Sequence, residues 1–84
     1  MKEVGKITHY YGKIGVAIVE LSGSLKVGDK IKVEGGKNEF DETLESMEVD
    51  RKPITEAKAG DVVGIKVREK VADGAAVYKL EEGE

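Results

Sequence analysis

The stretch Asp29-Lys30-Ile31-Lys32-Val33-Glu34 alternates charged and apolar residues one by one. Such alternation is typical of a β-strand that packs one face on a core, because successive side chains of a strand point to opposite faces. Ile31 and Val33 are therefore predicted to face the core, and the two lysines to face water. The segment Val63-Gly64-Ile65-Lys66-Val67 repeats this pattern.

Glycines divide the rest of the chain into segments that are rich in Val, Ile and Tyr, and no helix of normal length is evident. An all-β barrel is therefore predicted. Its six strands are expected at residues 3–10, 14–21, 29–34, 39–49, 62–67 and 75–80. The predicted core residues are Val16, Ile18, Ile31, Val33, Val63, Ile65 and Val77.

Two of these segments depart from simple alternation. The segment Ile14-Gly15-Val16-Ala17-Ile18-Val19 is apolar on both faces, which favours a central strand or one that curls at its glycine. In 39–49 the phase slips, because Phe40 and Leu44 share one face while Met47 and Val49 share the other. A β-bulge near Glu45-Ser46 is predicted to reconcile them.

Three short motifs predict turns. Gly28-Asp29 and Gly60-Asp61 each precede a predicted strand, and Asp73-Gly74 is a third pair of this kind. Glycine accepts a positive φ, and aspartate can accept hydrogen bonds from backbone amides just ahead of it. The two Gly-Asp sites are interpreted as turns of similar chemistry rather than as a duplication.

Composition limits the class of protein. The 84 residues fit one domain, 1–84, with a frayed tail at 81–84. No apolar run resembles a signal peptide or approaches the roughly 20 residues of a membrane span, and cysteine is absent, so a cytoplasmic location is expected. Because the net charge is −3 and arginine occurs only twice, strong affinity for nucleic acid is not expected.

The chemistry of an enzyme is missing from the sequence. His9 is the only histidine and has no cysteine to pair with, and the carboxylates of 41–50 alternate along a predicted strand, where they suit a solvated edge. No phosphate-binding loop or dinucleotide motif occurs. We therefore expect no catalytic activity, no metal site and no nucleotide cofactor.

Three segments together resemble domain II of elongation factor Tu and initiation factor 2. They are Gly5-Lys6-Ile7 leading into 16–19, the stretch from Leu21 to Ile31, and Ala59-Gly60-Asp61-Val62-Val63-Gly64-Ile65. The resemblance covers nearly the whole chain. It implies a six-stranded antiparallel Greek-key β-barrel, in agreement with the strands predicted above.

A closer likeness is to small stand-alone translation elongation factor-like proteins and to the C-terminal barrel of collagenase-like peptidases. It rests on Thr8-His9-Tyr10-Tyr11, Lys13-Ile14-Gly15-Val16-Ala17 and Glu45-Ser46-Met47. Neither family keeps catalytic residues in this barrel, so the likeness implies an accessory module.

The resemblance to the elongation factor also implies a site. That domain helps to hold the aminoacylated end of tRNA with a Glu-X-X-Arg, and Glu48-Val49-Asp50-Arg51 stands at the matching place. Glu48 would contact the terminal nucleotide and Arg51 the aminoacyl ester. Asp50 departs from the family pattern, in which an aromatic residue is usual, and its charge would repel a phosphate. The alternative is a structural ion pair of Glu48 with Arg51.

A second candidate surface is the hairpin His9-Tyr10-Tyr11-Gly12-Lys13. Aromatic rings beside a lysine can stack the bases of single-stranded RNA or anchor a protein partner. The alternative is that one tyrosine covers the barrel end while the other simply lies on the surface.

Two functions remain open. The first is a monomeric binding module related to translation factors, with tRNA, the ribosome or a translation-associated protein as its ligand. The second is an accessory barrel that binds a peptidase or another protein without contacting RNA.

Overall fold

The computed structural model describes residues 2–35 and 38–80. The predicted tail at 81–84 lies outside this range. All regular structure in the described part is β, so the all-β prediction is confirmed. The five longer strands that match predicted segments directly are β1 (Lys2–Tyr11), β2 (Val16–Leu21), β4 (Lys30–Gly35), β9 (Val62–Lys66) and β10 (Ala76–Leu80).

The predicted fourth strand is divided in two. β5 (Asn38–Thr43) pairs with β4, whereas β6 (Met47–Val49) pairs with β9. The predicted bulge at Glu45-Ser46 is therefore wrong, because the chain leaves one strand there and begins another. Both Leu44 and Met47 are buried. Three short strands were not predicted: β3 (Leu25–Lys26), β7 (Lys52–Ile54) and β8 (Glu56–Ala57).

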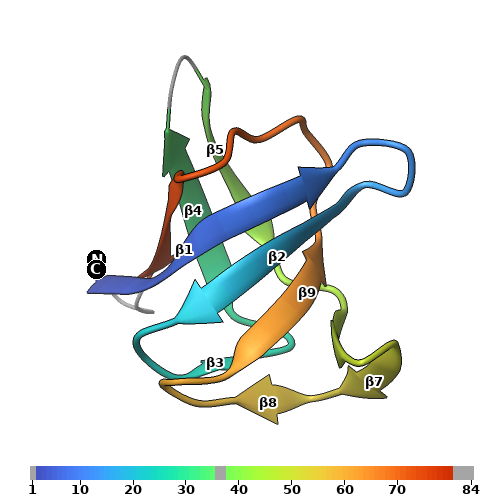
Figure 1. The fold of residues 1–84 in the computed structure, drawn as a ribbon. Coiled ribbons are helices and arrows are strands. Elements are labelled where there is room, and N and C mark those ends of the chain that lie inside the picture. The colour runs from blue at the N-terminus through green and yellow to red at the C-terminus, as the bar shows by residue number, and fades with distance from the viewer. Residues whose placement is uncertain (1, 36–37, 81–84) are drawn as a thin grey trace.

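The main sheet has the order β5-β4-β10-β1-β2-β9-β6-β7, and every ladder in it is antiparallel. β9 and β10 follow one another in the chain but lie on opposite sides of the β1–β2 hairpin, which is a Greek-key arrangement. The sheet curls so that β1 and β2 cross in front of β4 and β5 (Figure 1).

The segment around residues 25–29 helps to close the barrel. β3 pairs with β8 and, directly after it, the Val27 amide donates to the Thr55 carbonyl over 2.8 Å. On the other side the Gly28 amide donates to the Leu44 carbonyl, also over 2.8 Å. This segment therefore links the end of β5 to the β7–β8 region.

The two Gly-Asp turns have the same geometry. In each, the aspartate carboxylate accepts a hydrogen bond from the amide three residues before it, Lys26 to Asp29 and Lys58 to Asp61. Gly28 and Gly60 have φ of 100° and 94°, where a side chain would be strained. The predicted turn chemistry is confirmed at both sites.

The core contains Ile31, Val33, Val63, Ile65 and Val77, as predicted, each at most 1% exposed. The prediction for β2 is wrong by one residue. Ala17 and Val19 are fully buried in place of Val16 and Ile18, which lie half-buried on the outer face. Because β2 is apolar on both faces, alternation could not distinguish its inner face.

Candidate nucleic-acid or partner interface

A shallow groove on the outer face of the barrel lies between two hairpins. Its volume is about 250 Å³. The β1–β2 side contributes Ile14 and Val16, the β6–β7 side contributes Glu48 and Pro53, and β9 contributes Gly64 and Lys66, with Ser46 and Met47 beside them. The groove is smaller than the roughly 300–1,000 Å³ of pockets for drug-sized ligands. It therefore suits one planar ring or one side chain.

Gly64 forms part of the floor of this groove. A Cβ at this position would lie 3.3 Å from Val16 Cγ1 and 3.4 Å from Glu48 Cγ. Glycine in the middle of a strand often marks a place where another group approaches closely. Any side chain here would fill the space between the two hairpins.

The predicted site residues of β1 reach the same face through a bulge. The register shifts between Ile7↔Val19 and His9↔Ile18, so two residues of β1 oppose one of β2. Bulges of this kind re-aim side chains. As a result Ile7 is fully buried while His9 and Tyr11 are exposed, with ring centroids 4.4 Å apart in an edge-to-face contact.

The two tyrosines have different surroundings. Tyr11 is 47% exposed and pairs with Val16, a wall of the groove. Tyr10 is half-buried and packs against the core. Tyr11 thus lies on the surface, as the structural interpretation expects of one of the two tyrosines. Tyr10 is therefore not an open stacking surface.

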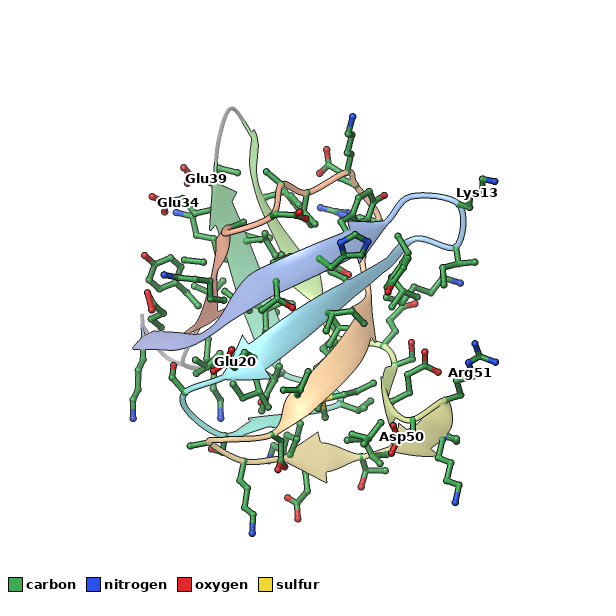
Figure 2. The ribbon with its side chains drawn as sticks, viewed as in Figure 1. Lys13, Glu20, Glu34, Glu39, Asp50 and Arg51 are labelled. Carbon is green, nitrogen blue, oxygen red and sulfur yellow. The ribbon has the colours of Figure 1, made fainter. Side chains whose placement is uncertain are left out.

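The candidate cations lie at the tips of the two hairpins. Lys13 and Arg51 extend away from the barrel on the side where these hairpins lie (Figure 2). Among the described residues no ion pair joins Arg51 to Glu48, so the expected structural pairing of the two is not found. Instead Glu48 lines the groove while Arg51 occupies the turn beyond it.

Sequence reasoning found one residue of the groove wall, Glu48, and its neighbours Tyr11, Lys13 and Arg51. It missed the apolar walls, Ile14, Val16 and Pro53, and the floor at Gly64. Ile14 is 63% exposed. The sequence signal that could have found these walls is the apolar character of both faces of residues 14–19. A strand needs apolar residues on only one face to pack on the core.

Two other hollows lie beside Arg68, which follows β9 closely in the chain. Their volumes are about 310 and 370 Å³, and both are lined by Glu42, Thr43 and Arg68. Here the Arg68 amide donates to Glu42 Oε1 over 3.2 Å, and its guanidinium donates to the Asp41 carbonyl over 2.7 Å. Partial burial raises the pKa of Glu42, against the opposing effect of Arg68. These bonds fasten β5 to the end of β9.

The described residues include no cluster of three metal-ligating side chains. They also include no helix long and apolar enough to cross a membrane.

Comparison with known proteins identifies the relatives of this barrel. The family model of elongation factor Tu domain 2 matches residues 12–77. A protein from Methanocaldococcus jannaschii named as an uncharacterized protease is 37% identical over 81 residues, which are 95% of this chain. The chain spans only 20% of the length of that relative.

The fold is similar to that of a solved domain. Two crystal structures of the C-terminal domain of a Geobacillus thermoleovorans protein, assigned to the U32 peptidases, superpose with a TM-score of 0.88 at 18% identity. They cover 94% and 95% of this chain, and 100% and 93% of the solved chains. This likeness shows the fold.

Proposed function

This chain belongs to the elongation factor Tu domain 2 family, and on that premise we propose that it is a binding module that catalyses no reaction of its own. Its ligand is the single-stranded acceptor end of tRNA, with the terminal base in the groove between the β1–β2 and β6–β7 hairpins.

The observation that best supports this proposal is that the two hairpins that carry the predicted segments flank one groove, with Glu48 among its lining residues. Ile14, Val16 and Pro53 offer apolar contacts to a base, and the Glu48 carboxylate can accept hydrogen bonds from its amino group. Tyr11 and His9 continue the same face. The groove holds one base rather than a whole substrate.

The charges around the groove favour a weak interaction. Lys66 lines the groove, and Lys13 and Arg51 lie at the tips of the flanking hairpins. Glu48 also lines the groove, Asp50 precedes Arg51 in the same turn, and the net charge of the chain is −3. Phosphate attraction is therefore small, so affinity should be weak and should fall only gradually as salt is added.

Titration of aminoacylated and deacylated tRNA at low salt tests the proposal. The aminoacylated form should bind better, and Gly64→Ala should weaken binding of both forms because its Cβ fills the groove. Gly23→Ala is the matched control: its Cβ would also lie 3.3 Å from a valine Cγ1, that of Val4, but in the turn after β2. Equal binding by the two variants, or no binding by the wild type at high micromolar protein, would contradict the proposal.

A second candidate function is supported by the relatives. A segment 37% identical to this chain belongs to a longer protein named as a protease, and the solved domain is the C-terminal domain of a protein assigned to the U32 peptidases. The chain would then bind a peptidase body as an accessory barrel without RNA. A pull-down from native lysate that retains a peptidase after nuclease treatment supports this function, and loss of all partners with nuclease supports the first.

A further inference from the structure

The β1–β2 hairpin ends in an apolar side chain that the fold leaves in solvent. Ile14 is 63% exposed, more than any other large apolar side chain of the described residues, and Tyr11 in the same hairpin is 47% exposed. Lys13 stands beside Ile14 in the chain and extends outward from the hairpin tip (Figure 2). The tip therefore presents an isoleucine next to a cation.

Backbone hydrogen bonds hold this tip in one conformation. The amides of Ile14 and Gly15 both donate to the Tyr11 carbonyl, over 3.3 and 2.9 Å. The Gly15 carbonyl accepts from the Val67 amide over 2.9 Å, which fastens the hairpin to the residue that follows β9. Gly15 has a φ of 66°, which glycine adopts without strain. A segment held in this way loses little conformational freedom when a partner covers it.

The groove beside this tip has the size and the lining to receive one such side chain. Its volume is about 250 Å³, Gly64 leaves its floor without a side chain, and Val16 and Pro53 supply apolar walls. Transfer of an aliphatic side chain from water into apolar surroundings is favourable. Glu48 lines the same groove, so a cation that accompanies the side chain would meet a carboxylate there.

The tip and the groove lie next to each other on one face of the barrel, and Ile14 belongs to both. A surface that contains a projection and a matching hollow is complementary to itself under a two-fold axis, because each copy can insert its projection into the other. Insertion of Ile14 into the groove of a second copy carries Lys13 toward the partner's Glu48. The symmetry repeats this contact, so two isoleucines are covered and two lysine–glutamate pairs form at once.

We infer that the chain associates with a second copy of itself through this face, with Ile14 of each copy in the partner's groove and Lys13 beside the partner's Glu48. Two hairpin tips cover less surface than the roughly 1,200 Å² of the smallest standard interfaces, so the association should be weak and reversible. The chain is then a monomer in dilute solution. The inference does not rest on the proposed function, although a copy seated in the groove excludes any other ligand from it.

Sedimentation equilibrium of the protein without RNA measures the association. The average mass of the wild type should rise above that of the monomer between about 0.02 and 1 mM. Ile14→Ala should weaken the association at least about tenfold, because the apolar contact is lost at two symmetric places. Val62→Ala is the matched control: Val62 is also an exposed apolar residue, at 53%, but it does not line the groove, so this variant should associate like the wild type.

Charge reversal tests the lysine–glutamate contact. Lys13→Glu and Glu48→Lys should each weaken the association about tenfold, because each brings like charges together at both symmetric contacts. The double variant restores both pairs with their signs exchanged and should associate within about threefold of the wild type. Net charge alone predicts a different pattern. A reversal takes it from −3 to −5 in Lys13→Glu and to −1 in Glu48→Lys, so repulsion between whole chains would rise in one variant and fall in the other.

Three results would overturn the inference. The first is a constant monomer mass for the wild type up to about 1 mM. The second is an association that Ile14→Ala leaves intact, since another face would then be responsible. The third is a double charge variant that associates as weakly as the single ones. None of these results decides whether the monomer binds tRNA, which the tRNA titration tests on its own.

Discussion

β2 and β9 are neighbouring strands that differ in how much their sequences reveal. They pair over five positions, with Ala17 opposite Ile65 and Ile18 opposite Gly64. β9 alternates so that its core residues are evident, whereas β2 is apolar on both faces. The difference teaches that alternation identifies the core side of a strand only where the other side is polar; on β2 the outer apolar residue Val16 lines the groove.

Substitution of a residue on the inner face of β9 should cause the largest loss of stability. Ile65 is fully buried, so Ile65→Ala should cost about 2–4 kcal/mol in the free energy of unfolding, through lost burial and the cavity left behind. Val62→Ala on the same strand should cost less than about 0.5 kcal/mol because Val62 is 53% exposed. Denaturant titration measures both. A cost below 1 kcal/mol for Ile65→Ala would refute its place in the core.

The two faces of β2 provide the next test. Val19→Ala should cost about 1.5–3 kcal/mol because Val19 is fully buried, whereas Ile18→Ala should cost less than about 1 kcal/mol. The larger side chain should thus give the smaller effect. If urea denaturation finds the reverse order, β2 has the phase first predicted, with Val16 and Ile18 in the core, and the groove wall is misplaced.

The fold was largely predictable because most strands follow a simple physical rule. Ile31, Val33, Val63 and Ile65 are inward by alternation alone, and the Gly-Asp turns follow from the conformational freedom of glycine. The break after β5 was not predictable, because Leu44, directly after β5, and Met47, at the start of β6, are both buried. The alternation of residues within one segment does not show that the chain leaves one partner strand and pairs with another.

The candidate site was predictable only in part. Glu48 and Arg51 followed from the family resemblance, and His9 and Tyr11 from their aromatic character. His9 and Tyr11 lie on the outer face of the barrel because of the bulge in β1 between Ile7 and His9. A bulge is an extra residue in a ladder, and neither its presence nor its position can be read from alternation in one strand.

The smallest expected effect concerns the end of β9, where Arg68 contacts β5. Partial burial raises the pKa of Glu42, so the folded state holds its proton more tightly than the unfolded state does. The stability associated with the neutral carboxyl is present below the unfolded pKa, about 4.3 for glutamate, and is lost as pH rises through the raised folded value. Glu42→Gln keeps an oxygen that can accept from the Arg68 amide and removes this titration.

The melting temperature of Glu42→Gln minus that of the wild type should therefore be near zero at low pH and become positive as pH rises through this window. Glu3→Gln, at an exposed position near the start of β1, removes the same charge without the burial and serves as the control. A negative difference at neutral pH would show that the charged carboxylate stabilises the contact with Arg68 more than burial penalises it. The end of β9 would then be fastened to β5 by charge, whereas β9 is joined to β2 by backbone pairing and packing.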